Sequence, residues 1–111
     1  MSGPQHGPAS SPHDLLVQAR QAYWQGHPEQ AVTLYRRVLE QSPDPAVLGE
    51  LGNVYFQMGR WQDAARTYAR AAERYARRGD RSTVMRLMAI VQRIDPQAAR
   101  QLQEHLRDLP R

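Results

Sequence analysis

The chain of 111 residues lacks cysteine, and all 15 of its basic Lys or Arg residues are arginine. Without cysteine, disulfides and thiolate metal sites are excluded. No apolar run is long enough to span a membrane, and the N-terminus has neither the basic nor the apolar region of a signal peptide. We therefore expect a soluble protein. It would be cytoplasmic if the chain is complete, and periplasmic or membrane-anchored if an N-terminal segment has been removed.

Residues that carry catalysis or bind metal are also sparse. The four histidines are scattered, with no two at the helical spacing that brings two imidazoles to one metal: His6, His13, His27 and His105. Neither a glycine-rich phosphate loop nor a nucleophile elbow is present. The sequence therefore predicts a protein that is not an enzyme and uses no metal and no cofactor.

Composition and charge leave two interpretations of the arginines open. With 41% apolar and 23% charged residues, the chain is ordinary for one soluble globular domain. The net charge is +4 and the pI near 10.1. Exclusive use of arginine reflects either genomic base composition or a surface that recognises anions, for which the guanidinium fork is well suited.

The clearest pattern lies between residues 48 and 71. Apolar and small residues recur three and four positions apart on both sides of a glycine: Leu48, Leu51, Gly52, Tyr55, Gly59, Ala64, Tyr68 and Ala71. This spacing places them on one face of an α-helix on each side of Gly59. The pattern predicts two amphipathic helices that pack as a close antiparallel pair, with the small residues allowing the backbones to approach.

This arrangement resembles the tetratricopeptide repeat, as found in bacterial proteins that carry such domains. Leu48 occupies the position where the family often has Trp, and Tyr68 the position where it often has Phe. The closing proline of the repeat is missing, because Ala76 occupies its place. The resemblance implies an all-α fold of antiparallel helix pairs, stacked into a right-handed superhelix that binds a protein or peptide.

The same spacing recurs after Gly26, Gly59 and Gly79, but at unequal intervals. The first two glycines are 33 residues apart, whereas the last two are 20 apart. The shorter interval has room for one helix. The helix that follows Gly59 should therefore close the central pair and also open a third one.

Prolines mark the helix starts, because a proline at the first helical position loses no hydrogen bond. The sequence predicts six helices, at about residues 12–25, 28–41, 45–58, 61–78, 81–93 and 96–107. They would form one repeat domain over residues 12–109, with the helix at 96–107 as a cap. Residues 1–11 contain no large apolar side chain, so we expect a disordered tail or a linker.

The resemblance implies a concave groove lined by the first helix of each pair. The candidate peptide-binding residues are Arg20, Tyr23, Trp24, Asn53, Phe56, Gln57 and Arg70. The aromatic residues would bury against the ligand, and the polar ones would fix its register. The alternative for the aromatic residues is packing between neighbouring helices. Binding of chaperone C-terminal tails is disfavoured, because Glu50 would repel a ligand carboxylate.

Two other functions remain open. The stack can associate with itself through an apolar patch of Met85, Met88 and Ile90. A stripe of Arg66, Arg70 and Arg74 can bind an anionic partner, or can simply be a solvated helix face. Nucleic acid is disfavoured as that partner, because no aromatic platform accompanies the stripe.

Overall fold

The computed structural model describes residues 11–110, and this part of the chain is helical without strands. It contains six helices: α1 (Pro12–Trp24), α2 (Pro28–Gln41), α3 (Pro45–Gln57), α4 (Trp61–Arg77), α5 (Arg81–Ile94) and α6 (Pro96–Arg107). Each bound lies within one residue of the predicted one. The predicted tail at residues 1–11 lies outside the described residues, except for Ser11, which caps α1.

The helix boundaries have local causes. Proline opens α1, α2, α3 and α6. Side chains cap the starts of α1, α3, α5 and α6 by accepting a backbone N–H of the first turn; these are Ser11, Asp44, Asp80 and Asp95. The turns after α1, α3 and α4 contain Gly26, Gly59 and Gly79 at φ of 82°, 76° and 78°. Glycine suits these turns because L side chains rarely adopt this left-handed conformation.

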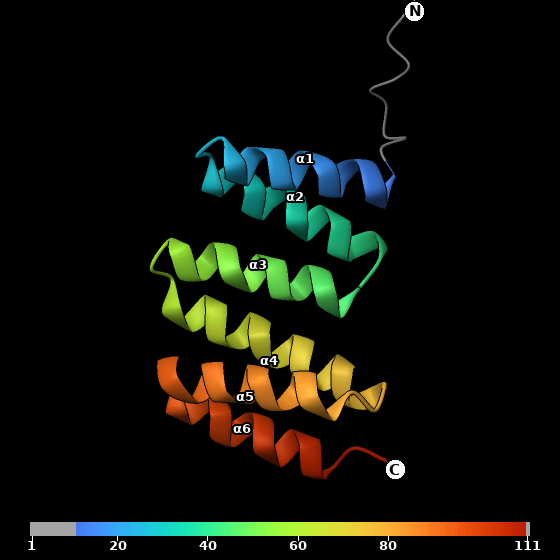
Figure 1. Ribbon diagram of the computed structural model, residues 1–111, viewed down its shortest axis with the longest axis vertical. Helices are drawn as coiled ribbons and strands as arrows, with labels where there is room; N and C mark the ends of the chain where they lie inside the picture. Colours follow the sequence, from blue (N-terminus) through green and yellow to red (C-terminus); the bar gives the residue numbers. More distant parts are fainter. Residues whose placement is uncertain (1–10, 111) are drawn as a thin grey trace, which may run out of the picture.

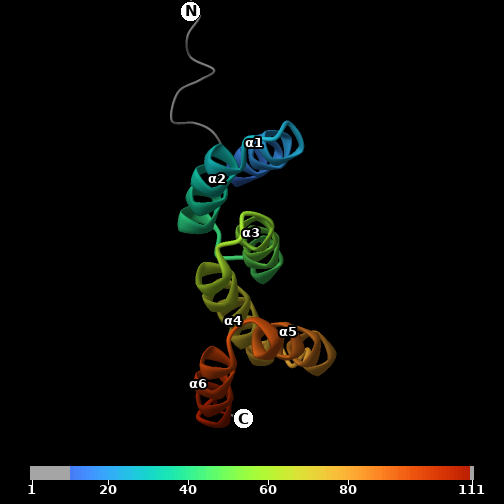
Figure 2. The same cartoon turned by 90° about the vertical axis from the view of Figure 1, so that its left-hand side faces the viewer.

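The six helices stack along the long axis of the molecule, which measures 54 × 32 × 18 Å (Figure 1). Seen from the side, α1, α3 and α5 lie along one side of the stack, and α2, α4 and α6 along the other (Figure 2). In the same view, α3 lies nearer to the side of α2, α4 and α6 than α1 and α5 do (Figure 2). The all-α fold of stacked antiparallel helix pairs is thus confirmed.

Helix α4 belongs to two pairs, as the unequal glycine spacing predicts. It packs along α3 on one side and along α5 on the other, and it also contacts α6. The turns at Gly59 and Gly79 have nearly the same φ, so both reverse the chain in the same way. Consecutive helices therefore continue the stack without a separate unit after α4.

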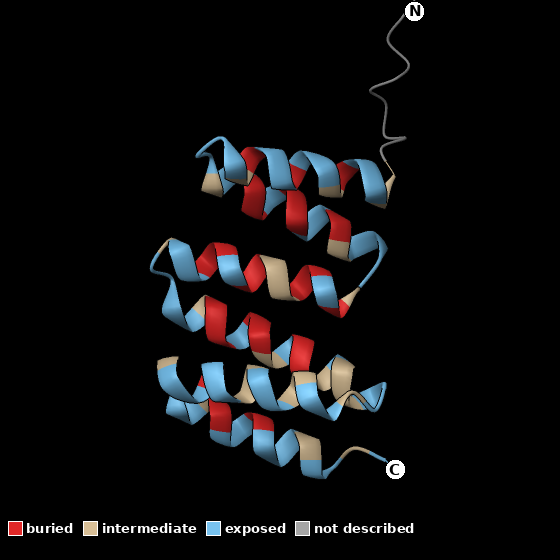
Figure 3. Cartoon of the chain, viewed as in Figure 1, coloured by how far each residue is buried: buried red, intermediate tan, exposed pale blue. Residues whose placement is uncertain are grey.

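The core is concentrated in α1 to α4 (Figure 3). Helices α3 and α4 approach closely where Gly52 faces the ring of Tyr68. A Cβ added at Gly52 would lie 2.6 Å from Cε1 of Tyr68, closer than side-chain atoms pack. Glycine at this position is therefore required by the packing of the tyrosine ring. Within the described residues, no helix combines the length and the apolar character needed to cross a membrane.

Candidate functional site

A small cavity of about 220 Å³ lies between α1 and α3. It is lined by Arg20, Tyr23, Trp24, Tyr35, Glu50, Asn53 and Val54. Four of the seven candidate residues thus come together: Arg20, Tyr23, Trp24 and Asn53. They meet because α1 and α3 lie on the same side of the stack, and because residues three and four apart share one helix face (Figure 2). We call this cavity and its rim the α1–α3 groove.

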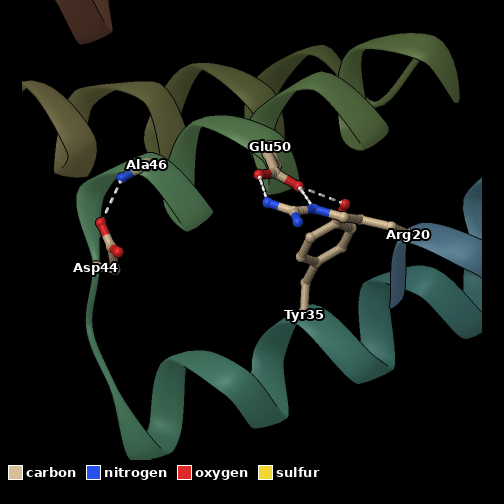
Figure 4. A network of polar contacts seen from close by, with 5 residues as sticks. All are labelled: Arg20, Tyr35, Asp44, Ala46 and Glu50. Atoms are coloured by element: carbon tan, nitrogen blue, oxygen red, sulfur yellow. Dashed lines mark hydrogen bonds and ion pairs between the residues drawn. The ribbon is translucent and has the colours of Figure 1, made fainter. Parts of the chain in front are cut away.

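A polar network joins three helices at the floor of the groove (Figure 4). The Arg20 guanidinium on α1 donates two hydrogen bonds to the Glu50 carboxylate on α3, from Nε at 2.9 Å and from Nη2 at 2.6 Å. The Tyr35 hydroxyl on α2 donates a third to Oε1 of Glu50 at 2.9 Å. Two parallel hydrogen bonds between a guanidinium and a carboxylate fix the relative orientation of the two side chains and stabilise their contact. Arg20 therefore ties α1 to α3.

The network keeps each group in its ordinary protonation state. Hydrogen bonds from Arg20 lower the pKa of Glu50, and those same bonds raise the pKa of Arg20. Burial, followed by the hydrogen bond to Glu50, raises the pKa of Tyr35. At neutral pH the carboxylate is therefore ionised and the phenol protonated, so that both hold the geometry described above. The negative charge that Glu50 brings to the groove is largely compensated by Arg20.

The aromatic candidates differ in their surroundings. Trp24 is 85% exposed at the rim of the groove, so its side chain does not pack between neighbouring helices. Tyr23 is half-buried beside it. Phe56 instead packs edge-on against Trp61 of α4, with ring centroids 4.9 Å apart, and lines no part of the cavity. Trp61 was not predicted from the sequence, although an aromatic residue directly after the Gly59 turn is a signal for such a contact.

Asn53 and Gln57 lie one turn apart on α3 and differ in their contacts. Oδ1 of Asn53 accepts a hydrogen bond of 2.6 Å from the hydroxyl of Tyr68, a residue that is buried against Gly52. Burial raises the pKa of Tyr68, which keeps that hydroxyl protonated. Gln57 is exposed at the end of α3, and its side chain has no hydrogen-bond partner within residues 11–110. Asn53 thus has a structural contact as well as a place in the groove.

Arg70 is not brought together with the other candidates. It lines a different cavity, of about 570 Å³, with residues of α2, α3 and α4 that include Arg36, Asp63 and Arg66. The reason is that α4 lies on the side of the stack with α2 and α6 (Figure 2). In this cavity Arg66 forms an ion pair of 2.9 Å with Asp63, which lowers the pKa of that aspartate. The arginine stripe is therefore partly paired.

Metal ligands do not gather anywhere in the part of the chain that the structure describes. There, no three or more His, Asp or Glu side chains are placed to hold one metal ion. The α1–α3 groove contains an exposed indole, a phenol, an amide and a compensated ion pair. Groups of these kinds are able to make apolar contacts and hydrogen bonds.

The helix pairs and their glycine turns correspond to a known family. The model of the tetratricopeptide repeat family matches residues 16–80 and again residues 50–110. The two matched ranges overlap over residues 50–80, which include the whole of α4, the helix that packs in two pairs. A search of curated proteins finds no match for the chain. Since the family model covers nearly the whole described part, the chain belongs to the tetratricopeptide repeat family.

Proposed function

We propose that the chain is a scaffold that binds a peptide or protein segment in the α1–α3 groove. Tetratricopeptide repeats generally mediate protein–protein interactions, and the family typically consists of non-catalytic scaffolds. The observation that carries the proposal is the exposure of Trp24 beside a cavity that also contains Tyr23 and Asn53. In this proposal, the ligand is held mainly by apolar contact with side chains that α1 presents on one face.

Trp24 is the residue on which affinity should depend most. The Trp24 indole is 85% exposed in the free chain, so most of its apolar surface can still be buried when a ligand binds. Tryptophan is enriched among the few interface residues that contribute most of the binding energy. Because Trp24 lies at the end of α1, its truncation also leaves the core between α1 and α2 in place.

The polar candidates have unequal roles in this proposal, and Gln57 lies one turn beyond Asn53 on α3 without lining the cavity itself. Gln57 has amide groups without a partner in residues 11–110, so it can hydrogen-bond a ligand backbone without breaking a contact of the fold. Asn53 keeps its two amide donors for a ligand while Oδ1 accepts from Tyr68. Arg20 acts through its pair with Glu50, which fixes the spacing of α1 and α3. Phe56 packs against Trp61 outside the cavity, and Arg70 would contact only a ligand long enough to reach the second cavity.

The proposal is tested by capture of binding partners with the immobilised chain, followed by titration of the partner that is recovered. Trp24→Ala should weaken binding by about 2 kcal/mol, or roughly thirtyfold. Gln57→Ala should weaken it by about fivefold, the loss of roughly one hydrogen bond. Binding should persist at moderate salt, because the groove contributes apolar and amide contacts more than unpaired charge.

Gln41→Ala is the matched control for Gln57→Ala. Both glutamines are exposed and end their helices, but Gln41 ends α2 on the opposite side of the stack. It should leave affinity unchanged. Asn53→Ala is less informative, because it also removes the acceptor of the Tyr68 hydroxyl. If Trp24→Ala retains the partner as well as wild type, the α1–α3 groove is not the binding site.

Self-association is a second candidate, favoured by exposed apolar residues on α5. Met85 is 71% exposed and Ile90 37% exposed, whereas Met88 is half-buried. An interface through this surface predicts a molecular mass that rises with concentration in sedimentation velocity. A constant monomer mass across the accessible concentration range contradicts it.

A further inference from the structure

A large cleft lies far from the α1–α3 groove, where α4 ends, α5 begins and α6 ends. It encloses about 1000 Å³, against about 220 Å³ for the groove cavity. The ends of these three helices meet at the edge of the stack opposite to the one where α1 ends (Figure 1). A ligand in this cleft would therefore leave Trp24 and the rest of the groove open.

The floor of the cleft is apolar and its rim is basic. Val84, Met85 and Leu106 contribute the apolar side chains, and Met85 is 71% exposed. Methionine is flexible and polarizable, which suits a surface that adapts to a bound side chain. Leaving this much of a large apolar side chain in water gains nothing for the fold. The floor thus offers area that a ligand can bury.

Three arginines surround this floor, and none of the acidic residues in 11–110 lines the cleft. They are Arg77 at the end of α4, Arg81 at the start of α5 and Arg107 at the end of α6. None of the three forms an ion pair with another group in residues 11–110. The neighbouring Asp80 keeps its negative charge while its carboxylate accepts from the backbone N–H and the hydroxyl of Thr83, so it offsets part of the charge of Arg81. With three arginines among the described lining residues, the cleft still carries net positive charge.

The position of Arg81 is not explained by helix stability. A cation in the last turn of a helix is favoured by the macrodipole, which accounts for Arg77 and Arg107. Arg81 is the first residue of α5, where the same dipole disfavours a positive charge. Asp80 caps this helix start with its carboxylate, and Arg81 adds a positive charge there that a bound anion would offset.

We propose that this cleft is a second binding site, and that it takes a short acidic peptide segment with an apolar anchor residue. The anchor would insert against Met85 and Leu106, while carboxylates on either side pair with Arg77, Arg81 and Arg107. The apolar side chains come from the ends of several helices around one cleft, an arrangement that fits an inserted side chain better than a flat membrane surface. Among the described residues, the lining contains no aromatic ring on which a nucleic-acid base could stack. Charge and shape together thus favour an acidic, apolar peptide.

The test uses the whole chain and a fluorescein-labelled peptide of glutamates around a central pair of leucines, followed by fluorescence anisotropy. The double variant Arg81→Gln with Arg107→Gln should weaken binding about tenfold or more. The matched double variant Arg93→Gln with Arg100→Gln removes the same charge from the same two helices outside the cleft, and should change affinity less than about twofold. Met85→Ser should weaken binding, and Trp24→Ala should leave it unchanged.

A second measurement on the wild-type chain needs no substitution. In a methyl NMR titration with the same peptide, the Met85 methyl signal should shift, whereas that of Met58, the residue directly after α3, should not. The proposal is overturned if the peptide does not bind, or if both double variants weaken binding equally. It is also overturned if single-stranded DNA or phosphatidylserine vesicles bind more tightly with the same dependence on Arg81 and Arg107. Self-association that Met85→Ser abolishes would identify a second copy as the occupant instead.

Discussion

The middle of the stack and its C-terminal end differ in how much of their surface is buried. In α3, seven residues are buried and in α4 six, whereas α5 contributes only Val91 and α6 only Ala99 and Leu102 (Figure 3). The fold between α1 and α4 is therefore supported by a dense core, and the C-terminal pair by a thin one. The exposed apolar and basic residues of the large cleft lie in and around this thinner part. Regions with little burial are also those that open most readily.

The polar links between neighbouring helices differ in the same way. In the first part, Arg20 and Tyr35 hold Glu50 with three hydrogen bonds. In the second part, α6 is linked to α4 through Nδ1 of His105 and Oε2 of Glu73 at 2.9 Å, with the histidine side chain 65% exposed. That histidine is charged only when protonated, whereas an arginine is charged throughout the accessible pH range. The first part is thus fixed more firmly than the second.

The largest difference is expected for truncation of buried leucines. Leu48 of α3 has no exposed surface, so Leu48→Ala should lower the free energy of unfolding by about 2 to 5 kcal/mol. Leu87 of α5 is only partly buried, so Leu87→Ala should cost less than about 2 kcal/mol. Urea unfolding followed by circular dichroism measures both. Equal losses would mean that α5 is packed as tightly as α3, and would remove the contrast between the two parts.

Two glycines of one helix test how closely α3 and α4 approach. Gly52→Ala should lower the free energy of unfolding by about 1 to 3 kcal/mol, because the new methyl group meets the buried ring of Tyr68. Gly49→Ala is the matched control. A Cβ at Gly49 meets nothing within 4 Å, so alanine should raise the free energy of unfolding by up to about 1 kcal/mol through helix propensity. Thermal unfolding of both variants measures these changes. If Gly52→Ala stabilises the fold, the close approach of α3 and α4 at Gly52 is contradicted.

Most of the fold could be predicted from the sequence because its determinants are local. Prolines at Pro12, Pro28, Pro45 and Pro96 open four of the six helices, and three glycines end helices in left-handed turns. The period of the small and apolar residues fixes which faces meet. The sequence predicted that small residues such as Gly52 allow α3 and α4 to approach, and the structure places Gly52 against the ring of Tyr68. The double role of α4 was predicted from the glycine intervals.

The site was predicted less completely, because it depends on contacts between helices distant in the chain. Arg20 and Glu50 are 30 residues apart, and only the relative placement of α1 and α3 brings them together. The sequence suggested Glu50 as a repulsive charge, whereas the structure pairs it. The side of the stack on which α4 lies separates Arg70 from the groove. The cleft between α4, α5 and α6 has no sequence motif, since three helix ends form it.

Acid should weaken the link at Glu50. The pKa of Glu50 is lowered in the fold, mainly by the hydrogen bonds from Arg20, below the ordinary value of 4.5. This group therefore stabilises the fold above pH 4.5, and the stabilisation is lost as the pH falls further and the carboxylate is protonated. Glu50→Gln should cost about 1 kcal/mol at neutral pH and much less in acid, as measured by thermal unfolding at both pH values. Glu40→Gln is the matched control, because Glu40 is at an exposed position of α2 and forms no ion pair within the described residues; it should change the free energy of unfolding little at neutral pH.

The smallest effect concerns α4, which is shared by the two parts of the stack. In its first turns, Asp63 pairs with Arg60 and Arg66, at 2.8 and 2.9 Å. Further along, Arg70 is exposed and lies four residues from both Arg66 and Arg74, and it forms no ion pair within the described residues. Like charges at this spacing repel, so Arg70→Gln should raise the free energy of unfolding by about 0.2 to 0.5 kcal/mol at low salt. The gain should vanish in high salt, because exposed charges are screened there.

Arg66→Gln should instead lower the free energy of unfolding by a similar amount, since it breaks the pair with Asp63. If both variants change stability in the same direction, the charges of α4 act as one solvated face, and the division of this helix between a paired and an unpaired part has no energetic consequence.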